Sequence, residues 1–408
     1  MKALPTIINR EFTLFITARV FFIAGLKMTP VILGWQLYEL TGSKLALGIL
    51  GLSEVIPAIL LALPAGVRVD RSNKRNLIMW CYVLYFLVMI YLGIITYKPI
   101  THSMGNAIAA FLICFGVFLT GIIRAYSSPA LNAFLAQLVT QAELVRAASI
   151  NTMTWLFASV VGPMLAGFLI GFTSATWSFV VVCTLMAAAL LIFRNIKEKP
   201  ISWNKGKART WDGVKEGLDF VFSQKALLGA ISLDMFAVLF GGAVALLPVF
   251  AKDILAVGPQ GFGLLMSATY MGNFIAIAYL TFKPLLKAQG KLLIYSVGGF
   301  GLCILVFALS RNFILSFSVL LLSGIFDGVS VIIRATIFQL FVPDEMRGRV
   351  SSVNSIFVNS SNELGQFESG LTASLMGTVP AVIMGGSITL LISIYTWFKL
   401  PTLRKFEW

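Results

Sequence analysis

Long apolar segments alternate with short polar segments along almost the entire chain. Twelve of the apolar segments are long enough to cross a bilayer as a helix, which takes about 20 residues. We therefore predict an all-α integral membrane protein, because a helix satisfies its own backbone hydrogen bonds in lipid. The predicted spans are residues 12–40, 45–67, 77–97, 106–128, 147–170, 176–194, 226–251, 261–282, 292–310, 313–338, 350–376 and 380–400.

One polar segment, residues 194–225, is far longer than the others and separates the spans into six and six. We predict an N-terminal six-helix bundle over 1–194, a linker over 195–225 and a C-terminal six-helix bundle over 226–408. Apolar residues recur at helical spacing late in the linker and predict an amphipathic helix at the membrane interface. The alternative is a solvated spacer with partial helicity. The recurring residues are Trp211, Val214, Leu218, Val221 and Phe222.

The two halves repeat each other weakly, which predicts pseudo-symmetric bundles. A shift of 215 residues aligns Arg19 with Asp234, and a shift of 203 residues aligns Arg124 with Asp327. The first half is therefore cationic at two positions where the second half is anionic.

Composition agrees with a membrane protein. Of 408 residues, 58% are hydrophobic and 12% are charged, and the mean hydropathy is +0.90. Soluble proteins carry roughly 25% charged residues. The net charge of +14 does not indicate nucleic acid binding, because the basic residues gather in loops between spans. We predict no cofactor and no metal site, since the four cysteines lie inside spans without metal-ligand spacing.

The basic residues also orient the chain. With both termini in the cytoplasm, 23 of the 31 Lys and Arg residues lie in cytoplasmic loops, tails and the linker. Only four, Lys44, Lys98, Lys252 and Arg311, lie outside. This is the asymmetry that the positive-inside rule describes. The first apolar segment is too long to be the core of a cleavable signal peptide.

Nine charged residues lie inside the predicted spans and away from their ends. A charge at bilayer depth costs roughly 3 kcal/mol, so it usually faces a partner or an aqueous cavity. Arg19 and Lys27 share nearly one face of the first span, and Asp327 and Arg334 share a face of the tenth, whereas Glu363 and Glu368 diverge. We assign substrate binding and ion coupling to Arg19, Lys27, Glu54, Arg124, Asp234, Asp327, Arg334, Glu363 and Glu368.

The repeat suggests how these charges pair. We hypothesise that Arg19 with Asp234, and Arg124 with Asp327, form cross-half pairs that close the cytoplasmic side and break when it opens. The alternative is that each charge is neutralised within its own half, for instance Arg124 by Glu54. A carboxylate removed from water binds a proton more readily, so Asp234 and Asp327, followed by Glu54, are the candidate proton carriers. A purely structural, paired acid is the alternative for each.

A polar loop follows the second span as Gly66-x-x-x-Asp70-Arg71 and ends in Lys74-Arg75. It resembles the signature loop between helices 2 and 3 of the major facilitator superfamily of transporters. Arg68 and Asn73 depart from that pattern. The resemblance implies two six-helix bundles, transport by alternating access, and a gating role for Gly66, Asp70, Arg71, Lys74 and Arg75.

Further segments resemble exporters of that superfamily. Gly162, Pro163 and Gly167 fit the motif of its antiporters, although ordinary packing of small residues is the alternative. Segments 34–43, 343–351 and 362–370 resemble a bacterial branch that includes the enterobactin exporter and macrolide-efflux proteins. The branch implies a protein of the bacterial inner membrane.

We predict a proton-coupled exporter of an amphipathic, anionic siderophore or drug. No phosphate-binding loop is present, so the energy must come from an ion gradient or from the gradient of the substrate itself. The alternative within the same fold is a proton-coupled importer. An enzyme is disfavoured by one loop histidine, His102, and no Cys or His cluster; a sensor or scaffold would not need the charges inside the spans. The expected partners are a small molecule, protons and lipid, with no nucleic acid, and the expected state is a monomer.

Overall fold

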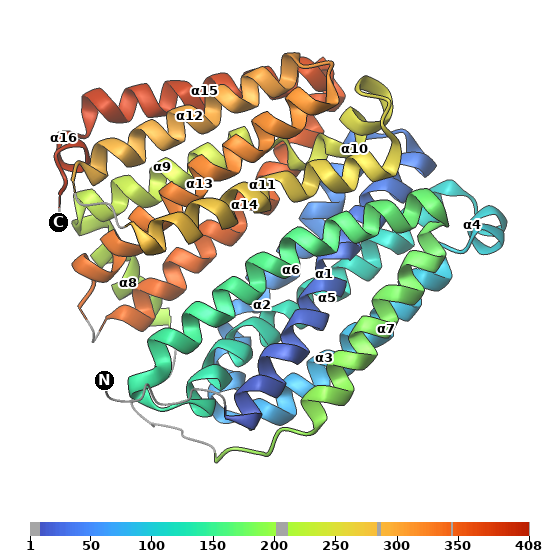
Figure 1. Cartoon of the computed structure of the whole chain (residues 1–408), viewed down its shortest axis with the longest axis horizontal. Helices are drawn as coiled ribbons and strands as arrows, with labels where there is room; N and C mark the ends of the chain where they lie inside the picture. The colour runs from blue at the N-terminus through green and yellow to red at the C-terminus, as the bar shows by residue number, and fades with distance from the viewer. Residues whose placement is uncertain (1–8, 201–210, 284–286, 344–345, 408) are drawn as a thin grey trace. The chain divides into compact units, whose positions relative to one another are not determined.

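A computed structural model describes residues 9–200, 211–283, 287–343 and 346–407. The described residues are almost entirely helical and include no strand (Figure 1). The helices are α1 (Arg10–Thr41), α2 (Lys44–Arg71), α3 (Lys74–Ile95), α4 (Lys98–Met104), α5 (Asn106–Leu138), η1 (Gln141–Glu143), α6 (Leu144–Phe172), α7 (Ala175–Arg194), α8 (Trp211–Ser223), α9 (Lys225–Gly241), η2 (Ala243–Leu246), α10 (Leu247–Val249), η3 (Phe250–Ile254), α11 (Gly258–Phe282), α12 (Gln289–Leu309), α13 (Phe313–Phe341), α14 (Arg347–Met376), α15 (Thr378–Lys399) and α16 (Pro401–Arg404).

Eleven helical segments of the described chain are long and apolar enough to cross a membrane, and they coincide with eleven of the predicted spans. Helix α14 coincides with the remaining predicted span, residues 350–376, and its 30 residues are long enough to cross a membrane. It is more polar than the others, because Asn362, Glu363 and Glu368 interrupt its apolar residues. Polar residues of this kind in a span usually face protein or an aqueous cavity.

The seventh predicted span is not one continuous helix. Helix α9 ends at Gly241, and the chain then passes through the 3₁₀ turn η2, the short α10 and the π-helical η3. Gly242 leaves the helical conformation with φ −79° and ψ 84°, and Pro248 cannot donate a backbone hydrogen bond. The apolar pattern alone could not reveal this break, since residues 241–251 are all apolar or small.

The described chain divides into two compact units, which are described separately. Residues 1–36 and 56–208 form the first unit, and residues 37–55 and 209–408 form the second. Aromatic side chains from α1, α3, α5 and α7 fill the core of the first unit. Phe22 stacks on Tyr82 with 4.2 Å between ring centroids, and Phe193 contacts both Tyr82 and Phe134. These contacts join α1, α3, α5 and α7 around a common centre.

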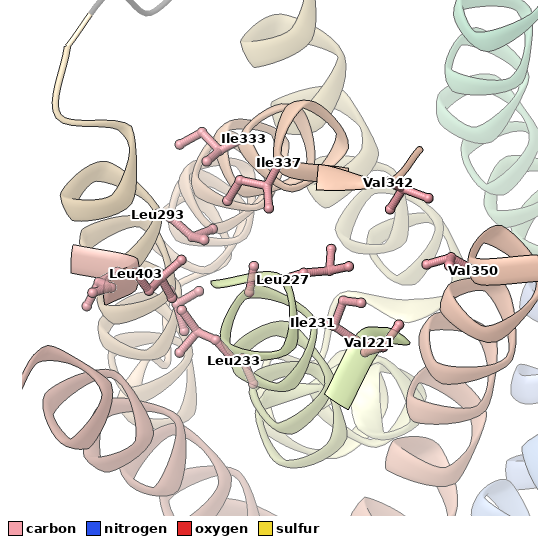
Figure 2. Close-up of a cluster of buried hydrophobic side chains, with 14 of the residues drawn as sticks. Val221, Leu227, Ile231, Leu233, Leu293, Ile333, Ile337, Val342, Val350 and Leu403 are labelled. Atoms are coloured by element: carbon pink, nitrogen blue, oxygen red, sulfur yellow. The ribbon is translucent and has the colours of Figure 1, made fainter. Parts of the chain in front are cut away.

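Aliphatic side chains from α8, α9, α12, α13 and α14 meet in the second unit (Figure 2). Val221 of α8 is fully buried among them, close to Val350 and Val353 of α14. A Cβ at Gly217 would lie 3.1 Å from the carbonyl oxygen of Arg349, so α8 lies directly against α14. Helix α8 covers the segment where the linker sequence predicted an amphipathic helix.

Helices α11 and α13 approach each other closely in the second unit. A Cβ at Gly272 would lie 1.9 Å from the carbonyl oxygen of Leu321, and one at Gly324 would lie 2.0 Å from that of Thr269. Only glycine permits such backbone contact, which is the usual way that helices associate in lipid. The contact places Asn273 of α11 beside Asp327 of α13, and these residues belong to the candidate site.

Candidate ion-coupling and substrate site

An ion cluster in the second unit connects α9 with α13. Arg334 on α13 forms an ion pair with Asp234 on α9, from Nη1 to Oδ2. Its other terminal nitrogen, Nη2, lies 3.9 Å from Oδ1 of Asp327. Asp327 precedes Arg334 by seven residues on α13, so the two side chains share a face of that helix. The Asp234 side chain is 7% exposed and that of Asp327 is 30% exposed. One guanidinium therefore lies between two carboxylates of unequal burial.

Two neutral side chains complete the cluster. Asn273 donates from Nδ2 to Oδ2 of Asp327 over 2.8 Å, and Arg334 donates from Nε to Oγ of Ser330 over 3.2 Å. These bonds hold the guanidinium and the Asp327 carboxylate in fixed orientations, because each group has a second partner besides the ion pair. The cluster is thus built by α9, α11 and α13 together.

A small cavity of about 20 Å³ adjoins the cluster. Asp234, Asp327 and Ser330 line it together with Ser296 and Phe300 of α12. Its volume suits about one water molecule, and polar groups on several sides are what such a water needs. The two carboxylates therefore border a space that can hold one water molecule.

The formal charge of the cluster is −1, since two carboxylates surround one guanidinium. A buried net charge is unfavourable unless it is compensated. Adding one proton to the cluster removes that charge. Asp234 shares a direct ion pair with Arg334, whereas Asp327 is farther from the guanidinium and more exposed. Asp327 is therefore the carboxylate with the weaker hold on the guanidinium.

Both acids have a partner within the second unit, and the cross-half pairing remains a prediction. The cross-half hypothesis assigned Asp234 to Arg19 and Asp327 to Arg124, but both acids contact Arg334 of their own unit. The physical reason is proximity: α9 and α13 pack in one bundle, so this pair forms as the bundle folds. The seven-residue spacing of Asp327 and Arg334 correctly predicted that they share a face.

The cations of the first unit contact aromatic rings. Arg19 is buried, and its guanidinium carbon lies 5.6 Å from the centroid of Phe15. Its Nε is a buried donor without a hydrogen-bond partner among the described residues. Lys27 Nζ lies 4.7 Å from the centroid of Trp155 on α6. A ring face attracts a cation but carries no net charge, so these contacts do not neutralise either residue.

The other charges predicted for the site lie on helices that do not contribute to the ion cluster. Glu54 on α2 and Arg124 on α5 are both half-buried. Glu363 on α14 is buried, and Glu368 on the same helix is half-buried and accepts a 2.8 Å hydrogen bond from Thr372. The cluster of Asp234, Asp327 and Arg334 is therefore a subset of the predicted site. Among the described residues, no group of three or more His, Cys, Asp or Glu side chains is arranged to hold a metal.

Residues 15–366 match the family model of the Major Facilitator Superfamily. The chain belongs to the Major Facilitator Superfamily. It is accordingly a multi-pass membrane transporter of small molecules and not an enzyme. Its fold is that of the superfamily, with twelve transmembrane helices in two pseudo-symmetric six-helix bundles.

Two bacterial relatives illustrate the similarity within the superfamily. The chain is 24% identical over 372 residues to the Staphyloferrin A transporter of Staphylococcus aureus (strain NCTC 8325 / PS 47), covering 90% of both chains. It is 25% identical over 289 residues to the Enterobactin exporter EntS of Escherichia coli O1:K1, covering 70% of this chain and 68% of that one. The first relative is named as a transporter and the second as an exporter.

Solved structures of superfamily transporters agree in fold. The nucleoside transporter NupG superposes with a TM-score of 0.76 over 96% of this chain and 100% of its own, at 13% identity. A D-xylose-proton symporter superposes with a TM-score of 0.74 over 97% and 99%, also at 13% identity. At such identity the likeness concerns the fold alone.

The signature loop of the superfamily is shorter than the sequence suggested. Gly66, Asp70 and Arg71 lie in the last turns of α2, and only Ser72 and Asn73 separate α2 from α3. Asn73 caps α3 by accepting a hydrogen bond from the backbone nitrogen of Asn76. Such a side-chain cap satisfies one of the free donors at a helix start. The connection is therefore a tight turn.

Arg75, in the first turn of α3, forms hydrogen bonds with the chain at the end of α7. It donates from Nη2 to the carbonyl oxygen of Arg194 over 2.8 Å and from Nε to that of Ile196 over 3.1 Å. The last carbonyl groups of a helix lack partners within it, and a guanidinium can supply two donors at once. Lys74 is buried and donates to the backbone oxygen of Asp70 over 3.1 Å. The loop is thus attached to the point where the linker begins.

The antiporter-like motif of the superfamily lies on α6 against α1. A Cβ at Gly162 would lie 2.8 Å from the carbonyl oxygen of Ala24 and 2.9 Å from Cβ of Lys27. Pro163 and Gly162 are both buried within the unit. The motif therefore permits close contact of α1 and α6, which is the physical role expected of small residues in a span.

Sequence analysis missed Asn273, Ser330 and Trp155. Asn273 carries no charge, and Ser330 and Trp155 are common in spans, so a search for charges passes over all three. An amide inside an apolar span is a weaker signal of the same kind, because it too needs a partner in lipid. A search for every Asn and Gln within the spans would have found Asn273.

Proposed function

We propose that this transporter exports an amphipathic, anionic siderophore-like molecule in exchange for protons, by alternating access. The observation that carries the proposal is the buried cluster of Asp234, Asp327 and Arg334, whose formal charge is −1. A cluster that gains neutrality by binding one proton can link protonation to a change of conformation. Asp327 is the proposed proton carrier, and the Asp234–Arg334 pair holds α9 and α13 together.

The substrate class rests on the relatives and on the cations of the first unit. The curated relatives are named for Staphyloferrin A and enterobactin. The buried guanidinium of Arg19 contacts the ring of Phe15, which carries no net charge. Both observations support an anion that also carries apolar surface. The antiporter-like motif around Gly162 supports export over import.

The proposal includes the placement of the chain in the cell. We place it in the bacterial inner membrane with both termini in the cytoplasm, as the distribution of basic residues supports. On this placement Arg75 and the linker lie on the cytoplasmic side. We expect the transporter to function as a monomer surrounded by lipid.

Inside-out vesicles with an acidic lumen test the coupling and the direction together. Iron-free enterobactin and staphyloferrin A serve as probes. Proton-coupled export predicts accumulation of a probe in the lumen that collapses when a protonophore dissipates the gradient. Depletion of preloaded probe from the lumen would instead identify a proton-coupled importer.

A pair of variants tests the role of Asp327. Asp327→Asn should abolish gradient-driven accumulation while exchange of probe across the membrane without a gradient continues. Asp219→Asn is the matched control, since it makes the same change at an exposed position of α8. Accumulation by Asp327→Asn at the wild-type level would exclude Asp327 as the proton carrier.

A further inference from the structure

A cavity of about 330 Å³ lies in the first unit, where α3 ends and α7 begins. This volume falls within the range of sites that bind small molecules. Thr176 donates a 3.2 Å hydrogen bond to the carbonyl oxygen of Thr96, so the two helix ends that border the cavity are joined directly. The cavity is lined by Tyr97, Lys98, Ser174, Thr176, Trp177 and Val180.

The cavity lies at the level where a bilayer meets water. Helices α3 and α7 are both long and apolar enough to cross a membrane, and the cavity adjoins one end of each. Tyrosine and tryptophan are enriched at this level, because each combines an apolar ring with one polar group. Tyr97 is 49% exposed and Trp177 is 64% exposed. Both rings are therefore accessible from outside the protein.

Lys98 gives the cavity a positive charge that no acid on the surrounding helices balances. It is exposed, and helices α3, α4, α5, α6 and α7 contain no Asp or Glu. Lysine binds phosphate groups, and a lysine beside a bilayer attracts anionic headgroups. Val180 lies about one turn farther into the span than Trp177 and is 47% exposed. The lining therefore changes from cationic to aromatic to aliphatic, from the end of the span inward.

We propose that this cavity binds an anionic phospholipid. The phosphate lies at Lys98, the glycerol region lies beside Tyr97 and Trp177, and the first acyl carbons lie along Val180. A phospholipid has the same order of charged, intermediate and apolar parts as the lining. A soluble phosphate would use Lys98 alone and leave the exposed rings uncovered. The inference holds for either direction of transport and for any coupling ion.

Fluorescence quenching in proteoliposomes of the full chain tests this inference. The bulk lipid is phosphatidylcholine with brominated acyl chains, which quenches tryptophans that it contacts, and unbrominated phosphatidylglycerol is added as the competitor. Subtracting the signal of Trp177→Leu or Trp177→Phe from that of the wild type isolates the emission of Trp177. Phosphatidylglycerol should displace the quencher from Trp177 with about fivefold preference, as one lysine at a bilayer surface suggests.

Lys98→Gln should reduce that preference to about one, since the lysine supplies the charge. Lys225→Gln is the matched control, because Lys225 is also an exposed first residue of a helix, and it should keep the full preference. Equal binding of both lipids by the wild type, or a full preference in Lys98→Gln, would overturn the inference. Excess glycerol 3-phosphate should change nothing; loss of the preference in its presence would identify a site for a soluble phosphate instead.

Discussion

The cations inside the two units have different kinds of contact. In the first unit, Arg19 and Lys27 contact the rings of Phe15 and Trp155. In the second unit, the cation Arg334 contacts two carboxylates. A ring attracts a cation but leaves its charge in place, whereas a carboxylate cancels it. On the proposed function, the first unit would bind the anionic substrate and the second unit would bind the proton.

The largest effect should come from removing the cation of the ion cluster. Arg334→Gln leaves two carboxylates buried side by side and should lower the free energy of unfolding by about 3–5 kcal/mol. Thermal unfolding in detergent measures this loss. The double variant Asp234→Asn/Arg334→Gln removes a charge of each sign and should recover much of the stability. Equal stability of the single and double variants would show that the pair does not hold α9 and α13.

The next effect concerns the contact of α1 with α6. Gly162→Ala places a methyl group 2.8 Å from the carbonyl oxygen of Ala24, so the helices must move apart. Overpacking of this kind costs about 1–3 kcal/mol. Thermal unfolding in detergent measures this loss. Wild-type stability of Gly162→Ala would show that the contact is not needed.

A smaller effect is expected where the signature loop meets α7. Arg75→Ala removes two hydrogen bonds to backbone carbonyl groups, each worth about 1 kcal/mol at partly exposed positions. We expect a modest decrease in thermal stability, which Arg75→Lys should only partly reverse because lysine lacks the planar fork. Lys98→Ala, at an exposed position of α4, should leave the thermal stability in detergent unchanged.

The smallest effect should follow from neutralising the buried cation of the first unit. Arg19→Gln removes a charge whose described contact is a ring, so no carboxylate is left behind. The free energy of unfolding should change by less than about 1 kcal/mol. A loss as large as that of Arg334→Gln would abolish the contrast between the units. Binding of anionic probes should nevertheless weaken, since the positive field is reduced.

Much of the fold could be predicted from the sequence because bilayer thickness imposes a local rule. A segment of sufficient length and apolarity forms a helix wherever it lies, so α3, α7 and α12 agree closely with their predicted spans. The rule failed at α9, where a Gly-Gly pair and Pro248 break the helix inside an uninterrupted apolar stretch. It also missed α4, a short helix in a polar loop.

The candidate site could be predicted only in part. The sequence identified Asp234, Asp327 and Arg334, because charges are rare and costly in spans. It could not assign their partners, and the repeat pointed to Arg19 and Arg124 instead. Residue Asn273 was missed, since it contacts Asp327 only because Gly272 and Gly324 allow α11 and α13 to touch.

The sequence by itself determined that this chain is a helical membrane transporter, where its spans lie and which side chains are charged within them. These properties depend on the length, apolarity and composition of short segments, and they do not require knowledge of what those segments pack against. Only the tertiary structure decided that Arg334 lies between two acids and that Lys27 contacts Trp155. The contacts of Arg334 with Asp234 and of Lys27 with Trp155 join residues 100 and 128 positions apart in the chain. They depend on how closely two helices approach, and that distance is set by packing against several other helices at once.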